Sequence, residues 1–92
     1  MAQAIITLKI MPVSPETDLE SIRDKAINLI KQFAGEGDMK IEEQPVAYGL
    51  KSIQIIFVMD ESLGSTEDLE TKISADEDVA SVEVTDVRRA IG

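Results

Sequence analysis

The run from Ser52 to Asp60 constrains the fold more than any other part of this sequence. Successive side chains of a strand point to opposite faces of a sheet. Here both faces are apolar, with Ile53, Ile55 and Phe57 on one and Ile56 and Val58 on the other. A strand that is apolar on both faces is typical of the middle of a sheet. We therefore predict a central strand over residues 51–60, with other strands beside it.

Three weaker segments also alternate between apolar and polar residues. The segment 3–11 places Thr7 and Lys9 on one face and Ala4, Ile6, Leu8 and Ile10 on the other. The half-polar segment 39–46 ends near Pro45, which favours an edge position because proline cannot donate to a neighbouring strand. The segment 79–87 sets Ser81, Glu83 and Thr85 against Ala80, Val82 and Val84. We predict a strand in each segment.

Two segments have helical spacing instead. Thr17 precedes Glu20 by three residues, which is the spacing of a capping box, and apolar residues then recur at helical intervals. A helix over 17–34 follows, and Gly35 and Gly37 end it. An acid-rich start at 66–68 precedes Leu69 and Ile73, which lie one turn apart. This pattern predicts a second helix over 66–75.

The predicted order is therefore βαββαβ. It indicates an α+β, ferredoxin-like fold, in which two helices cover one face of a four-stranded antiparallel sheet. Ninety-two residues suit one domain, which we expect to span 1–92. In this topology the carboxyl end of the last strand and the turn around Tyr48 lie at opposite ends of the strands. Tyr48 and Arg89 should consequently lie at opposite ends of the molecule.

Charge limits the kinds of partner. The net charge is −9, and residues 60–86 carry ten acids against one base, Lys72, before a basic tip at Arg88 and Arg89. Nucleic acid as a direct partner is disfavoured, because its phosphates would be repelled over most of the surface. The aromatic residues are Phe33, Tyr48 and Phe57, too few and too scattered for the base-stacking sheet of an RNA-binding domain.

Enzymatic chemistry has little to use here. The chain lacks histidine and cysteine, and therefore an imidazole base or a thiolate nucleophile. It also lacks a P-loop spacing, so we expect no catalytic residue, cofactor or metal. No apolar run approaches the length of a membrane span, and Met1 to Gln3 lack the basic region of a secretory signal. We expect a cytoplasmic protein that is a monomer when free.

Two further features of the sequence leave alternatives open. Tyr48, between Ala47 and Gly49, fits a turn aromatic that caps the core, or an exposed anchor for a protein partner. Arg88 and Arg89 fit a frayed, solvated end, or a functional cationic tip.

Several segments together resemble the guanine-nucleotide exchange domain of elongation factor 1-beta, in particular its short archaeal form. The resemblance covers nearly the whole chain. It is carried by the strand ending Leu8-Lys9-Ile10-Met11-Pro12, the helix start Thr17-Asp18-Leu19-Glu20, the hairpin 45–54 around Tyr48-Gly49-Leu50-Lys51, and the ending 79–89. The hairpin and the ending are the specific parts.

The resemblance implies a factor that promotes GDP-for-GTP exchange on the elongation factor 1-alpha GTPase, in its GDP-bound or nucleotide-free state. In that family a basic residue near the carboxyl end reaches toward the Mg²⁺ and phosphates, and the hairpin end touches another part of the GTPase. The implied partner-binding residues are Arg88, Arg89, Tyr48, Gly49 and Lys51. Eukaryotic members have lysine where this chain has Arg89. The alternative is a ferredoxin-like regulatory module that binds a small molecule.

Overall fold

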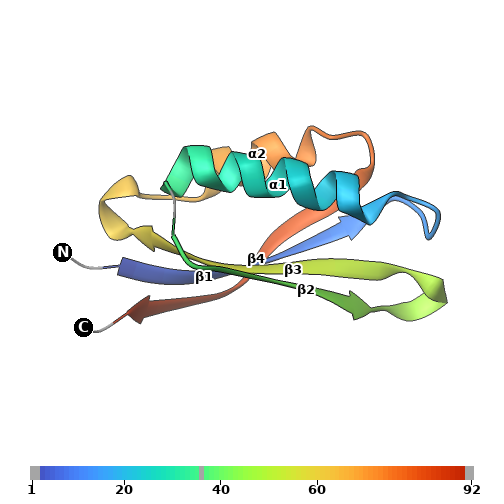
Figure 1. Cartoon of the computed structure of the whole chain (residues 1–92), viewed down its shortest axis with the longest axis horizontal. Coiled ribbons are helices and arrows are strands. Elements are labelled where there is room, and N and C mark those ends of the chain that lie inside the picture. Colours follow the sequence, from blue (N-terminus) through green and yellow to red (C-terminus); the bar gives the residue numbers. More distant parts are fainter. Residues whose placement is uncertain (1–2, 36, 91–92) are drawn as a thin grey trace.

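A computed structural model describes residues 3–35 and 37–90 of the chain. The described residues form, in chain order, β1 (Gln3–Pro12), α1 (Leu19–Ala34), β2 (Met39–Pro45), the 3₁₀ turn η1 (Ala47–Gly49), β3 (Lys51–Asp60), the 3₁₀ turn η2 (Glu61–Leu63), α2 (Glu67–Ser74) and β4 (Val79–Ala90). Figure 1 shows both α-helices on one side of the sheet. None of these helices is long and apolar enough to cross a membrane.

The strands form one antiparallel sheet in the order β2-β3-β1-β4. This arrangement confirms the predicted ferredoxin-like α+β fold. It also confirms the central position of β3 and the edge position of β2. Gln3, at the start of β1, pairs with Asp60 on one side and with Ala90 on the other. The ends of β3 and β4 therefore lie together, at the opposite end of the sheet from η1, as Figure 1 shows.

The core lies between the sheet and the helices. The predicted apolar face of β1 is almost fully buried there, and β3 contributes Ile53, Ile55, Phe57 and Met59. The helices add Ile22, Ala26, Ile30, Leu69 and Ile73. Replacing one such side chain, for example Leu8→Ala, typically costs about 2–5 kcal/mol, because it leaves a cavity as well as removing buried surface.

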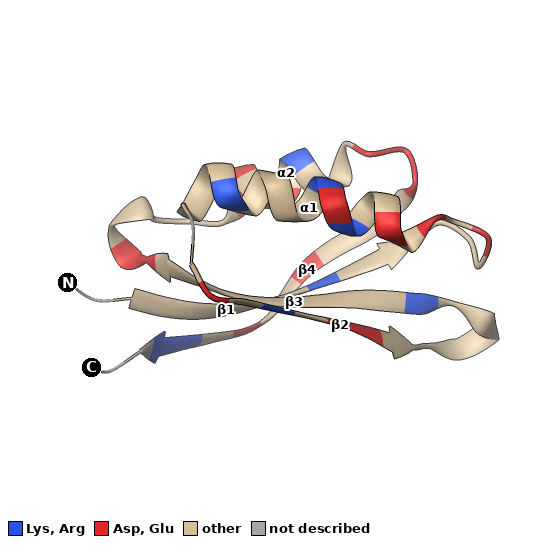
Figure 2. Ribbon diagram, in the orientation of Figure 1, with Lys and Arg blue, Asp and Glu red and all other residues tan. Residues whose placement is uncertain are grey.

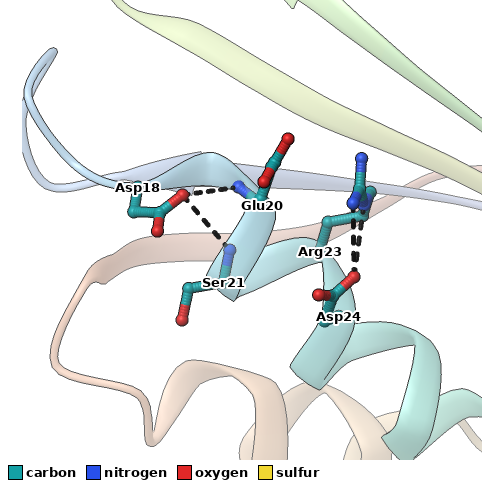
Figure 3. Close-up of polar contacts among 5 residues, drawn as sticks. All are labelled: Asp18, Glu20, Ser21, Arg23 and Asp24. Carbon is teal, nitrogen blue, oxygen red and sulfur yellow. Dashed lines mark hydrogen bonds and ion pairs between the residues drawn. The ribbon is translucent and has the colours of Figure 1, made fainter.

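The start of α1 differs from the prediction. The helix begins at Leu19, and the Oδ1 atom of Asp18 accepts hydrogen bonds from the backbone N–H groups of Glu20 at 3.1 Å and Ser21 at 3.4 Å (Figure 3). Thr17 belongs to the preceding turn, where its Oγ1 accepts from the N–H of Ser14 at 3.3 Å. The predicted capping box is therefore wrong. Asp18 takes the capping position because a carboxylate accepts from two free N–H groups of the first turn. Gly35 ends the helix in a left-handed conformation, as expected.

The last strand differs more. It runs to Ala90, three residues past the predicted end, so Arg88 and Arg89 lie within it and not beyond it. Its pairing with β1 shifts twice, between Thr7 and Leu8 and between Met11 and Pro12. The extra residues on β4 are Thr85 and Ala80. Because of the second shift, Val79 is buried and Ala80 is exposed, which corrects the predicted alternation.

Candidate partner-binding site at the two ends of the sheet

The bulge at Thr85 decides which way each arginine points. Val84 pairs with Leu8 and Asp86 with Thr7, so Thr85 is left over. A strand with one extra residue changes the alternation of all side chains after it. Val87 and Arg89 consequently pair with Ile6 and Ala4, whose side chains face the helix layer. Arg88 pairs with Ile5 and lies on the other face of the sheet.

Both arginines have acidic partners. Arg89 donates from Nε to Oε1 of Glu61 at 2.8 Å and from Nη2 to Oε2 at 3.0 Å. Arg88 donates from Nε to Oδ2 of Asp86 at 2.8 Å. The side chains remain largely exposed, 69% for Arg89 and 76% for Arg88. The interpretation of a frayed end is therefore wrong, and the tip carries one ion pair on each face of the sheet.

The pairing of Arg89 with Glu61 alters the acidity of both groups. Hydrogen bonds from Arg89 hold the pKa of Glu61 below its usual value, and the same bonds raise the pKa of Arg89. The neighbouring Asp60 also has a lowered pKa, chiefly because its Oδ1 accepts from the backbone N–H of Ser62 at 2.9 Å. All three groups are consequently charged at neutral pH.

A hollow of about 320 Å³ lies beside this ion pair on the helix side. Its walls include Glu61, the turn 64–66, and the apolar residues Ala4, Ile6, Met59 and Val87. Val87 is 62% exposed, although it faces the same side as the core. This end of the molecule thus offers a partner a guanidinium paired with Glu61, and Glu61 also lines a hollow with several apolar walls.

Tyr48, at the other end, stands free of the core. Its side chain is 93% exposed, so the interpretation that it caps the core is wrong. Its φ of 62° and ψ of 31° lie in the left-handed region, and the next residue, Gly49, has a φ of 77°. The carbonyl of Ala47 accepts from the N–H of Leu50 at 3.3 Å, which closes a turn of the type that needs positive φ at both central residues.

A bulky residue in the left-handed region costs about 1–2 kcal/mol relative to ordinary backbone. Asparagine or glycine would relieve that strain at position 48. The strain brings Tyr48 no burial in return, and it holds the phenol at the outermost point of the hairpin. Strained residues of this kind cluster at functional sites. The geometry therefore favours the anchor interpretation, which stays a prediction.

Gly49 and Lys51 flank the same turn. Lys51 begins β3, pairs with Pro45 at the end of β2, and is exposed. Both residues border a hollow of about 180 Å³, whose other wall comes from Pro12, Ser14, Pro15, Thr17 and Leu19. The three hairpin residues of the predicted site are thus together at one end, while both arginines are at the other. The longest dimension of the molecule is 42 Å.

Figure 2 shows how charge is divided between these ends. Blue arginines mark the tip of β4, and a red segment marks the adjacent turn after β3. Acidic residues also colour the helix layer and its loops. Within the described residues, no three acidic side chains gather closely enough to hold a metal ion.

Sequence reasoning missed Glu61 and Thr85. The four valines of β4 that face the helix side are Val79, Val82, Val84 and Val87. Their spacings of three, two and three residues depart from strict alternation at the two places where β4 has an extra residue. That spacing could have revealed the bulges. Glu61 has no comparable signal, because it meets Arg89 across 28 positions of sequence.

Comparisons with known proteins fit this arrangement. A protein named elongation factor 1-beta from Methanobrevibacter smithii is 44% identical over 89 residues, covering 97% of this chain and 98% of the relative. Proteins of the same name from Methanosphaera stadtmanae and Methanocaldococcus jannaschii are 40% and 34% identical, again over nearly full length.

Among solved structures, one named BlrP1 BLUF matches with a TM-score of 0.57 at 14% identity. The match covers all of this chain and 57% of that one, and at this identity it shows the fold alone. The family described as the EF-1 guanine nucleotide exchange domain matches residues 5–90 and so includes the hairpin, Arg88 and Arg89. This chain belongs to the EF-1 guanine nucleotide exchange domain family.

Proposed function

We propose that this chain contacts the elongation factor 1-alpha GTPase from both ends of its sheet and promotes exchange of GDP for GTP through Arg89. Family membership gives the chain the role of a guanine-nucleotide exchange factor in translation. One structural observation carries the assignment of residues. An oriented cation and a strained, exposed aromatic project from opposite ends of one rigid sheet.

The action proposed for Arg89 is differential binding. GTPases hold GDP largely through phosphate contacts and a bridging Mg²⁺. A guanidinium that enters this region would displace Mg²⁺ and shift the switch segments, and it would thereby favour the GTPase state that has lost nucleotide. Arg88, on the opposite face of β4, contributes a second cation to the same end. Arginine is planar and presents several donors, so it can bind two oxygens at once, whereas an ammonium acts as a point charge.

The action proposed for the hairpin is anchoring. Tyr48 offers a large apolar ring with a polar hydroxyl, and tyrosine is enriched among residues that dominate protein interfaces. Gly49 and Lys51 would border the contact, since they line the hollow beside the turn. An anchor at one end fixes the orientation in which the other end approaches the nucleotide.

Exchange is a cycle of binding events. Whatever the factor does to weaken nucleotide binding, nucleotide does equally to weaken binding of the factor. GTP therefore completes the cycle by displacing the factor.

No covalent bond is made or broken, so the chain itself is not an enzyme in the usual sense. We place the whole chain, 1–92, as one cytoplasmic domain that is monomeric when free, binds the GDP-bound or nucleotide-free GTPase and makes no direct contact with nucleic acid or membrane.

The alternative is a regulatory module of the same fold. Such a module would bind a small molecule with paired sheets and a pocket formed by a loop. The family match over residues 5–90 favours exchange instead.

The test is stopped-flow release of a fluorescent GDP analogue from the GTPase at saturating factor. Arg89→Ala should slow release by at least about tenfold, as expected for loss of one strong contact in the rate-limiting state. Its unfolding midpoint should stay within about 3 °C of the parent, because the side chain is exposed. If Arg89→Ala and the double variant Arg88→Ala/Arg89→Ala both release GDP at the parent rate, the carboxyl end is not the active end.

A further inference from the structure

We infer that Glu61 is a positioning residue for exchange, which holds the Arg89 guanidinium so that its outer edge meets an anionic group of the GTPase–nucleotide complex. The inference rests on the role proposed above for Arg89. It goes beyond that role by assigning a second residue, from a different part of the chain, and by stating which atoms of Arg89 remain available.

The geometry of the ion pair identifies those atoms. Glu61 is bound through Nε and Nη2, one edge of the guanidinium. A guanidinium carries five N–H donors in one plane. The pair with Glu61 uses the Nε–H and one N–H of Nη2. The edge formed by Nη1 and the second N–H of Nη2 is not engaged by Glu61, and it suits a phosphate or carboxylate that presents two oxygens. The ion pair can therefore persist when Arg89 binds such an anion.

Glu61 is itself held in place from its own side. It begins η2 immediately after β3, where the Asp60 carboxylate accepts from the N–H of Ser62 at 2.9 Å. The turn is closed by a hydrogen bond from the N–H of Gly64 to the carbonyl of Glu61 at 3.1 Å. The Glu61 side chain is 33% exposed, half the value for Arg89. A short, capped turn thus supports the carboxylate, and the carboxylate supports the long arginine.

Arg89 gains from such support because its long side chain is largely exposed. It lies on edge strand β4, next to Ala4, whose small side chain gives it little to pack against. A flexible arginine loses rotamer freedom when it binds a partner, and prior ordering removes part of that loss. The register shift at Thr85 is also required, since it brings Arg89 to the face where Glu61 lies.

Charge alone would give Glu61 the opposite role, that of masking Arg89. A carboxylate beside the guanidinium weakens its positive field. If Glu61 only masked Arg89 in this way, removal of Glu61 would speed GDP release. The outer edge that Glu61 leaves unengaged argues for positioning, and the two roles predict opposite effects of removing Glu61 on the rate of GDP release.

The test measures GDP-analogue release across factor concentrations, so that the maximal rate and the half-saturating concentration are separated. Glu61→Gln removes the charge and can no longer accept from both donors. It should lower the maximal rate at least about threefold, within the range of coupling between contacting residues. In the Arg89→Ala background, the same change should have no further effect. Asp24→Asn is the matched control, because Asp24 is also an exposed carboxylate in an ion pair, with Arg23 on α1, and it should exchange at the parent rate.

The outcomes separate the two proposals. If Arg89→Ala slows release and Glu61→Gln does not, the positioning role is wrong and the role of Arg89 stands. A faster rate for Glu61→Gln would show masking and overturn the inference. Equal slowing by Glu61→Gln with and without Arg89 would also overturn it, because Glu61 would then act independently. If Arg89→Ala itself has no effect, the proposed function of the carboxyl end fails first.

Discussion

The hydroxyl of Thr85 donates to the backbone carbonyl of Thr7 at 3.5 Å, at the point where β4 has one residue more than β1. This contact bridges the bulge from the longer strand to its partner. On the amino-terminal side of the bulge, Val84 is the residue that faces the helices. On its carboxyl-terminal side, Val87 and Arg89 face them. The choice between the two arginines at the carboxyl end is thus made four residues earlier.

Deletion of Thr85 should leave that choice in place. Val84 pairs with Leu8 and Asp86 with the adjacent Thr7, so removal of the extra residue makes the pairing regular without shifting any later pair. Arg89 therefore stays opposite Ala4, on the face where Glu61 lies. Stability should fall by about 1–3 kcal/mol, as for other changes that disturb a special backbone site. In the deletion variant, removal of Arg89 should still slow GDP release more than removal of Arg88. Thr85→Ser, which keeps the residue and its hydroxyl, is the control and should behave as the parent. A deletion variant that depends on Arg88 instead would contradict this account of the bulge.

The amino-terminal cap of α1 gives a test of the fold alone. Asp18→Ala should destabilise the protein by about 1 kcal/mol, because two N–H groups of the first turn lose their acceptor. Asp24→Ala removes a carboxylate from the same helix without touching a cap (Figure 3) and should cost less. Thermal unfolding followed by circular dichroism measures both. If Thr17→Ala proved more damaging than Asp18→Ala, the capping box centred on Thr17 would be the better description.

The order of strands and helices could be predicted because each element has a clear period of its own. The strand 51–60 has the predicted bounds, and Ala4, Ile6, Leu8 and Ile10 are buried together as their spacing indicated. Local patterns are sufficient for such elements, since burial of one face selects one secondary structure.

The ends of the elements were harder to predict. The end of β4 depends on its register against β1. A bulge interrupts the alternation of apolar and polar residues by which a strand is recognised in a sequence. The contact of Glu61 with Arg89 depends on where two distant strands finish. The exposure of Tyr48 depends on the type of turn. That type could not be predicted, because tyrosine is uncommon at positive φ. The residues of the candidate site therefore stay a prediction from the sequence, and their ion pairs could not be predicted from it.

Acid should selectively remove one stabilising contact between the helix layer and the loop before β4. The N–H of Asp78, and secondarily Lys25, hold the pKa of Asp76 below its ordinary value of 3.8. A group whose pKa is lowered by folding stabilises the protein above its ordinary pKa, and that stability is lost as the pH falls through the lower, folded value. Asp76→Asn should therefore lower the unfolding midpoint at pH 7 by up to about 4 °C. The difference from the parent should shrink toward zero as the pH falls through that lowered pKa. An equal difference at both pH values would show that charge on Asp76 contributes nothing.

Removal of the Tyr48 ring should weaken the complex and leave the fold intact. Tyr48→Ala should reduce affinity for the GTPase by about 1–3 kcal/mol, as interface aromatics commonly do. Tyr48→Phe separates the ring from the hydroxyl and should keep most of the affinity if the ring is the anchor. Tyr48→Gly is the stringent control for backbone strain. It should raise thermal stability, because glycine accepts a φ of 62° without cost, and still bind weakly. Calorimetric titration of nucleotide-free GTPase gives the affinities. Parent affinity in the alanine variant would return Tyr48 to a role in the turn alone.

The last prediction concerns the replacement of Arg89 by the lysine that the eukaryotic members of the family carry. Arg89→Lys retains the charge, so exchange should stay well above that of Arg89→Ala. It should not equal the parent, because the three N–H donors of an ammonium share one nitrogen, so Glu61 and an anion must crowd around a single charge instead of taking two separate edges. In this background Glu61 competes with the partner for the same ammonium. Glu61→Gln should therefore help the lysine variant, although it harms the parent. Stopped-flow release from the four proteins of this cycle measures the reversal of sign. If Glu61→Gln slows the lysine variant as much as it slows the parent, the two-edged use of the guanidinium is wrong.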